Sequence, residues 1–480
     1  MNLLERYKLL SVQTRSAIWF AASSCVLQGI NFISLPFFTR LMSVEQYGIV
    51  AAYGAWVTVI TVFATLNIQA GAFNSGITIN SEKKDEYSSS MQGLLLVLCV
   101  VVFIATFGFA AVIYNFFDLP LIFIALMFVQ ILATGFFSLF SARERYDYRY
   151  RTLLFFTLLY AVLSVGIPLL GVYFCPNENQ KAVIKVVGTI VGMTIVGLII
   201  LVYTQKKKPC FFNKEFWKFA ICFTVPLVPH YLSMIVLGQS DRIIISSLCG
   251  ESAVAVYTVA YQIGTALTVI SGALNSSIVP WQYQKIKASD YRGLKKKLNQ
   301  YVVLVVIIAV ILSLFSPELM LIAAPASYQD AVYVIPPVIA GIVFTFVYNV
   351  LSNYEFYYMA NKAISVASVI AAVLNIVLNF ALIPQYGFMV AAYTTLFCYA
   401  ALALFHTLFA LYIVRKKVGK VTAKEFFSPA SIWAVCLVGT VLILATIVIF
   451  DYLVIRLILI SIGIITCFVA RKKALWKSEC

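Results

Sequence analysis

The sequence predicts an all-helical integral membrane protein with about fourteen transmembrane helices, arranged as two six-helix lobes plus two C-terminal helices. Of its 480 residues, 62% are hydrophobic and 11% are charged, whereas a soluble domain has roughly 25% charged residues. A spanning helix needs about 20 mostly apolar residues, because the hydrocarbon core is about 30 Å thick. Many such windows occur, with basic residues between them. These observations exclude a soluble protein.

The apolar windows mark the expected spans in order along the chain. The first follows a basic segment, residues 1–16, and we expect a retained span rather than a signal peptide because no A-x-A-like cleavage site follows it. Only Asp451 and its neighbours separate the last two windows, so a single bent or re-entrant pair fits nearly as well. The expected spans lie near 17–38, 46–68, 93–114, 119–141, 152–174, 183–204, 219–239, 252–275, 300–322, 331–351, 363–383, 387–412, 430–450 and 452–470.

The distribution of Lys and Arg between alternate loops tests this helix count. With the N-terminus inside, the expected cytoplasmic loops hold 30 of the 35 basic residues. The expected outer loops hold Arg40, Lys181, Lys185 and Arg242, and Arg456 lies near the outer end of the last span. Cytoplasmic loops of membrane proteins are enriched in Lys and Arg, and a wrong helix count would scramble this asymmetry. We therefore expect an even number of spans with both termini cytoplasmic.

A basic stretch divides the expected spans into two sets of six. We expect an N-terminal six-helix lobe over 1–204, a cytoplasmic basic linker over 205–218 and a C-terminal six-helix lobe over 219–414. Residues 415–480 would add two transmembrane helices and a cytoplasmic tail. A weak internal similarity supports two lobes, since Arg40 precedes Ala-Ala-Tyr-Gly at 51–54 and Arg242 precedes Val-Ala-Tyr-Gln at 259–262. Internal repeats of this kind are common in transporters.

Signatures of catalysis and metal binding are missing. The chain has no P-loop, no H-E-x-x-H and no G-x-S-x-G. Its two histidines, His230 and His406, exclude a histidine-rich metal site, and its ten cysteines are scattered singly. The net charge of +16 lies in short clusters between spans, which indicates topology rather than a nucleic-acid partner. We expect no catalytic residue, no metal site, no cofactor and no nucleic-acid partner.

Two arginines at corresponding positions of the lobes are candidates for substrate binding. Arg40 and Arg242 could hold a phosphate-bearing substrate by bidentate hydrogen bonds, with Asp241 beside them. The alternative is interfacial snorkelling and an inter-lobe salt bridge with Asp241. Both interpretations stay open from the residues alone.

Uncharged polar residues within the expected spans suit a sugar better than a metal cation. Asn375 and Asn379 lie four residues apart, on one face of a helix. Such residues serve equally as hydrogen bonds between helices. The candidates are Gln28, Asn31, Gln262, Asn275, Asn375 and Asn379, together with Asn67, Gln69, Asn349 and Asn353.

Two segments are candidates for gating. Pro226 and Pro229 precede His230. Prolines leave backbone carbonyls without their helical hydrogen bonds and allow a kink. Residues 143–151 alternate charge and aromatic rings, with Arg143 and Arg145 at their start. These two arginines could gate the cytoplasmic entrance or contact a pyrophosphate head group. The alternatives are a histidine bonded to a neighbouring helix and a basic anchor at the interface.

Four stretches resemble the polysaccharide flippases of the multidrug/oligosaccharidyl-lipid/polysaccharide exporter superfamily, which include O-antigen and capsule repeat-unit flippases. The resemblance covers essentially the whole chain. The stretches are FTRLMSVEQYG at 38–48, GQSDRIII at 238–245 with VYTVAY at 256–261, NIVLNFALIPQYG at 375–387, and AAYTT at 391–395.

The resemblance implies a transporter rather than an enzyme: two lobes around a cavity that opens alternately to either side. The implied substrate is an undecaprenyl-pyrophosphate-linked oligosaccharide, moved outward across a bacterial cell membrane, the inner membrane in a Gram-negative cell. Membrane lipids, a polysaccharide polymerase and chain-length proteins are the implied partners, with Na⁺ or H⁺ as coupling ion. Cationic residues deep in the spans, which some relatives use for the pyrophosphate, are scarce here. The alternatives are a cation-coupled multidrug antiporter, a membrane-embedded polymerase or ligase, and a structural scaffold.

Overall fold

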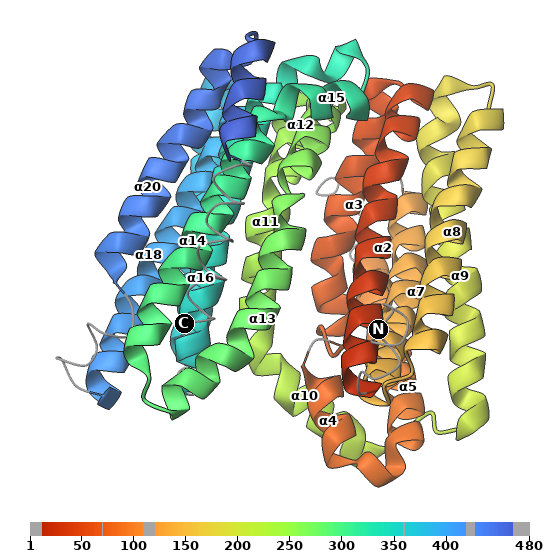
Figure 1. The fold of residues 1–480 in the computed structure, drawn as a ribbon. Coiled ribbons are helices and arrows are strands. Elements are labelled where there is room, and N and C mark those ends of the chain that lie inside the picture. The colour runs from red at the N-terminus through yellow and green to blue at the C-terminus, as the bar shows by residue number, and fades with distance from the viewer. Residues whose placement is uncertain (1–11, 70, 109–120, 359–360, 419–427, 464–480) are drawn as a thin grey trace, which may run out of the picture. The chain divides into compact units, whose positions relative to one another are not determined.

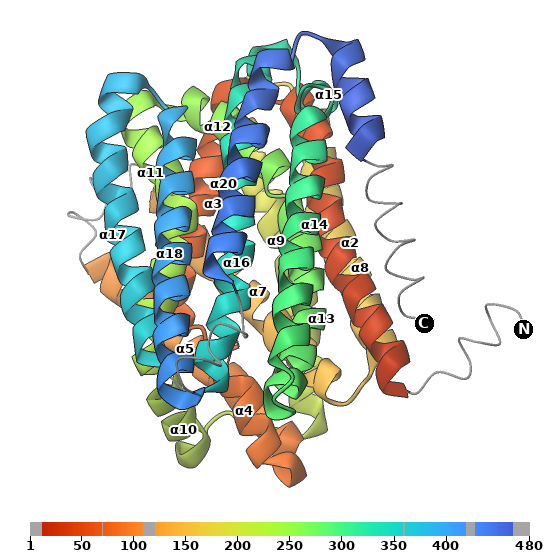
Figure 2. The same cartoon turned by 60° about the vertical axis from the view of Figure 1, so that its left-hand side comes forward.

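The computed structural model describes residues 12–69, 71–108, 121–358, 361–418 and 428–463. Every regular element in these ranges is a helix (Figure 1; Figure 2). Thirteen helical segments are long and apolar enough to cross a membrane, and a shorter apolar helix covers Leu453–Gly463. The expectation of an all-helical membrane protein with about fourteen spans is confirmed. The expected cytoplasmic tail lies outside the described residues.

The helices form two compact units, residues 1–235 and 236–480. The first holds α2 (Val12–Leu41), α3 (Val44–Thr65), α4 (Ala72–Ile79), η1 (Ser81–Lys83), α5 (Lys84–Gly108), α7 (Leu121–Tyr146), α8 (Tyr150–Phe174), η2 (Glu178–Gln180), α9 (Lys181–Lys207), α10 (Lys214–Thr224) and η3 (Val225–Leu227). Helix α11 (Val228–Cys249) begins in the first unit and ends in the second. The second continues with α12 (Glu251–Gly264), α13 (Leu267–Lys287), α14 (Tyr291–Leu314), α15 (Ser316–Ala323), η4 (Ala326–Val334), α16 (Ile335–Tyr357), α17 (Asn361–Tyr386), α18 (Val390–Val418), α20 (Pro429–Ala445) and η5 (Thr446–Ile449).

Short polar residues and glycines end one helix and begin the next. Ser43 and Asn213 cap α3 and α10, because their side-chain oxygens accept backbone N–H groups of the first turn. Gly250 and Gly387 have φ of 83° and 76°, a conformation that a residue without Cβ adopts at little cost. They allow the sharp reversals from α11 to α12 and from α17 to α18.

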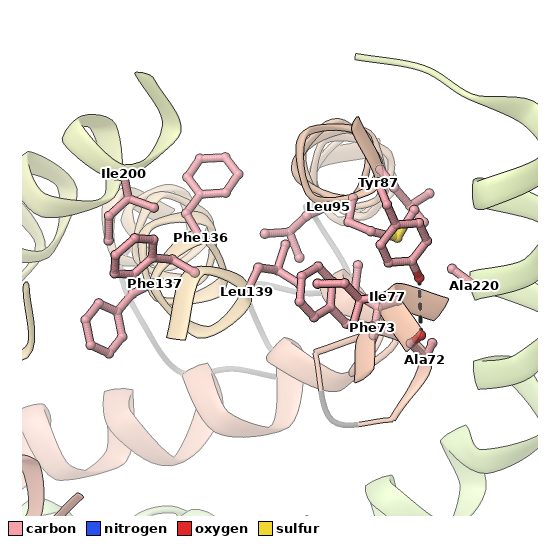
Figure 3. Packing of buried hydrophobic residues seen from close by; sticks show 14 of the residues in the cluster. Ala72, Phe73, Ile77, Tyr87, Leu95, Phe136, Phe137, Leu139, Ile200 and Ala220 are labelled. Atoms are coloured by element: carbon pink, nitrogen blue, oxygen red, sulfur yellow. Dashed lines mark hydrogen bonds between the residues drawn. The ribbon is translucent and has the colours of Figure 1, made fainter. Parts of the chain in front are cut away.

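The first unit has a hydrophobic core where α4, α5, α7, α9 and α10 meet (Figure 3). Tyr87 is fully buried there, and its hydroxyl donates to the Ala72 carbonyl at 3.2 Å. The Tyr87 ring packs against Phe73 and Phe216, with centroids 5.7 and 5.2 Å away. Phe216 comes from α10, just beyond the basic stretch 205–218. This packing attaches α10 to the first unit.

Helix α16 is the centre of the second unit. In the span Ala326–Tyr357, 83% of the most apolar window is buried, more than in any other described span. Helices α12, α13, α14, α18 and α20 pack around it. A helix that is apolar on all sides belongs inside a bundle, since it has no polar face to expose.

Two helices run further than the sequence predicts. The span expected to end near residue 239 continues as α11 to Cys249, so Asp241 and Arg242 lie inside a helix rather than in an outer loop. The placement of Arg242 in a loop is wrong, because both charged side chains find hydrogen-bond partners within the second unit. Likewise α13 continues to Lys287, although the span in this region was expected to end near residue 275.

The packing of α8 against α9 should depend on the close contact at Gly192. A Cβ added there would meet the Leu163 carbonyl oxygen at 2.4 Å, so Gly192→Ala should force the helices apart and cost about 1–3 kcal/mol. The measurement is the thermal unfolding midpoint of the purified chain in detergent. Gly166→Ala is the matched control, because nothing lies within 4 Å of its added Cβ. Equal midpoints for the two variants would contradict the close contact.

Candidate substrate and coupling sites

A buried carboxylate, Asp241, organises the polar centre of the second unit. Its side chain is 1% exposed. One oxygen accepts from the Asn379 amide at 2.7 Å, and the other accepts from the hydroxyls of Tyr257 and Thr395 at 2.6 and 2.7 Å. These donors come from α17, α12 and α18. The carboxylate therefore joins four helices.

Further polar side chains extend this cluster. Asn375 donates to Thr395 at 3.0 Å and accepts from Ser240 at 2.6 Å and from Asn379 at 3.3 Å. The hydroxyl of Thr394 donates to the Asn379 oxygen. Asn375 and Asn379, expected to share one face, indeed point into one network. Thr394, Thr395 and Tyr257 also belong to it, although their positions in the sequence do not predict a site role.

Arg242 is turned away from its neighbour Asp241. Its guanidinium donates to the Gly238 carbonyl at 3.0 Å and to Gln239 at 2.8 Å, and it lies 4.5 Å from the Tyr261 ring centroid. Within the described residues, the donors to Asp241 are uncharged, and Arg242 forms no ion pair with it. An inter-lobe salt bridge with Asp241 stays a prediction, since Arg40 belongs to the other unit. Arg242 is 8% exposed and held by a cation–π contact.

Arg40 lies in the first unit, at the end of α2. Its guanidinium donates to the Pro36 carbonyl at 3.0 Å. It lines a largely apolar pocket of about 520 Å³, whose other wall is Leu169, Leu170 and Tyr173 of α8. Arg40 and Arg242 belong to different units, so their joint action on one phosphate stays a prediction.

The C-terminal end of α7 carries a network of ion pairs. Arg143 is buried and bonds Asp85 at 2.8 Å and Asp147 at 2.5 Å, while Lys84 bonds Asp147 at 2.9 Å. Arg149 lies 3.6 Å from the same Asp147 carboxylate. Arg145 has no part in this network and lines a second pocket. The two arginines that the sequence grouped for gating therefore have different surroundings.

The remaining candidates are spread over both units. Asn275 accepts from Asn353 at 3.4 Å, and Asn353 also donates to the buried Gln282 at 3.1 Å. Gln282 was not singled out from the sequence, because it lies beyond the span expected near 252–275. Gln28 and Asn31 are exposed residues of α2, and Gln262 lies half-buried in α12.

The expected kink before His230 coincides with a break in helix geometry. The chain passes from α10 through the 3₁₀ turn Val225–Leu227, which contains Pro226, into α11, where Pro229 takes the second position. His230 lies beside the Tyr231 ring, with centroids 5.8 Å apart. A gating role for these residues stays a prediction.

Two further acidic residues are paired inside the second unit. Glu355 and His406 are fully buried and bonded at 2.7 Å, and Arg456 bonds Glu318 at 2.6 Å. The described residues hold no group of three or more His, Cys, Asp or Glu that could bind a metal ion. The buried polar groups of the second unit thus include amides and hydroxyls around Asp241 and the paired groups Glu355–His406 and Glu318–Arg456.

The fold of this bundle of apolar helices is shared with solved structures of a lipid flippase and of transporters of the MOP superfamily. The lipid II flippase MurJ in an inward closed conformation is similar, with a TM-score of 0.69 and 15% identity over 95% of this chain and 99% of that chain. An inward-facing multidrug resistance MATE family transporter has a TM-score of 0.61 and 15% identity over 82% and 96% of the two chains.

Sequence comparison gives the family. A family model described as polysaccharide biosynthesis protein matches residues 14–286, more than half of the chain, and the chain belongs to this family. A second model, MatE, matches residues 226–381. The Lsg locus putative protein 1 of Haemophilus influenzae is 23% identical over 363 residues, which are 72% of this chain and 85% of that protein. The resemblance stated from four sequence stretches is confirmed, and the chain is a multi-pass membrane protein of the polysaccharide biosynthesis family.

Replacing Asp241 by its amide should weaken the centre of the second unit. Asn accepts through one oxygen only, so at least one buried donor would lose its partner, at a cost of about 1–3 kcal/mol. We expect Asp241→Asn to lower the unfolding midpoint in detergent. Asp451→Asn, at an exposed position, is the control and should leave it unchanged. A midpoint equal to that of the control would show that the network contributes little.

The ion pairs at the end of α7 should make stability sensitive to acid. Burial raises the pKa of Asp147, but hydrogen bonds and charge from Lys84 and Arg143 outweigh it and hold this pKa below its ordinary value. Because the folded-state pKa is depressed, the contribution is present above about pH 4, the unfolded pKa, and is lost as pH falls through the folded one. Asp147→Asn should lower the thermal unfolding midpoint at pH 7. The difference in midpoint between this variant and wild type should narrow toward pH 3. With Asp330→Asn, an exposed control, no such narrowing is expected.

Proposed function

We propose that this protein is a flippase that moves undecaprenyl-pyrophosphate-linked oligosaccharide repeat units from the cytoplasmic to the outer leaflet by alternating access. The product would serve O-antigen, capsule or other surface polysaccharide synthesis. The family match carries the proposal, because that family is described by polysaccharide biosynthesis. The shared fold with MurJ, a lipid II flippase, supports it.

The chemistry of the described spans agrees with a sugar-bearing substrate. Amides and hydroxyls form the polar clusters, and these groups both donate and accept hydrogen bonds, as sugar hydroxyls require. Arg242 and Arg40 are the cations proposed for the pyrophosphate. A polymerase or ligase is disfavoured by the short expected outer loops, which leave no room for a catalytic domain.

The proposed setting is a bacterial cell membrane, the inner membrane in a Gram-negative cell, with both termini cytoplasmic. The asymmetry of basic residues supports this orientation. A polysaccharide polymerase and chain-length proteins are the proposed partners, since they would consume the translocated repeat units.

The coupling ion, Na⁺ or H⁺, is proposed to act at the Asp241 cluster. A buried carboxylate with amide and hydroxyl oxygens around it supplies the hard ligands that such cations prefer. Its donors come from three further helices, so a cation that displaced them would change helix packing. This would link ion binding to the movement of the lobe.

A second candidate function is a cation-coupled multidrug antiporter of the same superfamily. The MatE model matches residues 226–381, and this range contains the two buried carboxylates Asp241 and Glu355. Carboxylates buried within spans are common in proton relays. An antiporter would confer drug resistance on a sensitive host without restoring surface polysaccharide.

Complementation tests the proposed function. The chain is expressed in a bacterium lacking its own repeat-unit flippase, and surface polysaccharide is measured for wild type, Arg242→Ala, Arg40→Ala and the exposed control Arg415→Ala. Wild type and Arg415→Ala should restore polysaccharide. Arg242→Ala should reduce it about tenfold or more, because a charge-assisted contact to phosphate would be lost.

The other results have distinct meanings. Restoration that survives both Arg242→Ala and Arg40→Ala would keep the function and reduce these arginines to structural anchors. Absence of restoration, with the protein present in the membrane and several repeat-unit structures tried, would favour the antiporter. Drug-resistance assays on the same strains would then test that alternative.

A further inference from the structure

A pocket of about 460 Å³ lies within the first unit, between α2, the turn before α4, α4 itself and the end of α7. Polar side chains make up much of its wall: Gln69, Asn74, Thr78, Ser138 and Arg145. Its size falls in the range of small-ligand sites, about 300–1,000 Å³. The pocket is built from one unit alone, so its shape does not depend on how the two units are placed.

Arg145 is the cation of this pocket, and it is available to a ligand. Its neighbours Arg143 and Arg149 are engaged with Asp147, whereas no carboxylate among the described residues lies within 4.0 Å of Arg145. Its guanidinium makes a long hydrogen bond of 3.3 Å to the Ser24 hydroxyl and lies 5.9 Å from the Phe20 ring centroid. The side chain is exposed. An unpaired guanidinium beside polar donors favours an anionic ligand, phosphate above all.

Gln69, in contrast to the donor Arg145, offers a hydrogen-bond acceptor to a ligand. Its amide nitrogen donates to Asn67 at 2.8 Å, but its amide oxygen is buried without a hydrogen-bond partner among the described residues. A buried unpaired acceptor is costly, so it marks a place where a donor is missing. A fully ionised phosphate has no proton to donate, whereas a sugar hydroxyl has one.

We propose that this pocket binds a phosphorylated sugar, with the phosphate at Arg145 and a sugar hydroxyl donating to Gln69. The proposal rests on the proposed function and adds a separate place for the phosphate and first sugar in the first unit, besides the contacts proposed for Arg40 and Arg242. The ligand is either the head group of a lipid-linked sugar or a soluble sugar phosphate, which share this chemistry. Binding here would place the head group beside the ion pairs of α7.

Native mass spectrometry of the full chain in detergent can measure the binding of defined probes. Four probes separate the two contacts and the two sources: farnesyl-pyrophosphoryl-N-acetylglucosamine, farnesyl pyrophosphate, a neutral farnesyl N-acetylglucosaminide, and soluble N-acetylglucosamine 1-phosphate. The variants are Arg145→Ala, Gln69→Leu and Arg149→Ala. The last is the matched control, because it removes the same charge from the same segment but does not line the pocket.

We expect the wild type to bind the pyrophosphoryl sugar lipid more tightly than either lipid probe lacking one part. Arg145→Ala should weaken the binding of the phosphate-bearing probes about tenfold or more and leave the binding of the neutral probe unchanged. Gln69→Leu should weaken the binding of the sugar-bearing probes only. Arg149→Ala should stay within about twofold of wild type on all four. Tight binding of the soluble sugar phosphate would support the pocket and identify the soluble source.

The proposal is overturned if Arg145→Ala binds the phosphate probes as Arg149→Ala does, or if Gln69→Leu weakens the sugarless probe equally. Its failure is distinguishable from failure of the proposed function. If Arg145→Ala binds the probes normally and the wild type complements, the proposed pocket site is wrong and the proposed flippase function stands. Loss of binding in Arg145→Ala without complementation by the wild type keeps the pocket as a sugar-phosphate site.

Discussion

The hydrocarbon core of a bilayer offers no hydrogen-bond partners, and the architecture of this protein follows from that constraint. Backbone groups are satisfied within each helix, which is why helices are the elements of the described spans. Polar side chains bond either to their own helix, as Arg242 does, or to side chains from distant helices, as Asp241 does. The Asp241 network joins α11, α12, α17 and α18 for this reason.

Neighbouring residues can satisfy this constraint in opposite ways. Asp241 accepts hydrogen bonds from three other helices, whereas Arg242 bonds its own helix and an aromatic ring. The aspartate side chain is short and its carboxylate only accepts hydrogen bonds, so the donors come from other helices. A guanidinium on a long stem can reach back to a carbonyl one turn away. Consecutive charges inside one helix therefore do not need each other as partners.

The same contrast appears at the end of α7. Arg143 is fixed by Asp85 and Asp147, so it holds α7 to α5 and the following turn. Arg145, two residues on, points to another side of the helix because successive residues are separated by about 100°. One charged segment thus supplies both a structural anchor and an unpaired cation beside a polar pocket.

Much of the fold could be predicted from the sequence, since span length and apolar composition are local properties. The helical membrane class and the family follow from them and from short motifs such as residues 375–387. Part of the candidate site was also predictable: Asn375 and Asn379 share a helix face because they are four residues apart. The partners Thr395 and Gln282, and the end of α11, were not.

The sequence by itself determined that the chain is a bundle of membrane helices, because hydrophobicity over about 20 residues depends on no distant neighbour. Tertiary structure alone decided which polar side chains meet. Asp241 and Thr395 are far apart in the chain, and only helix packing brings the hydroxyl to the carboxylate. It also decided that Arg143 is paired and Arg145 is not, because the acidic partners come from α5 and the turn after α7.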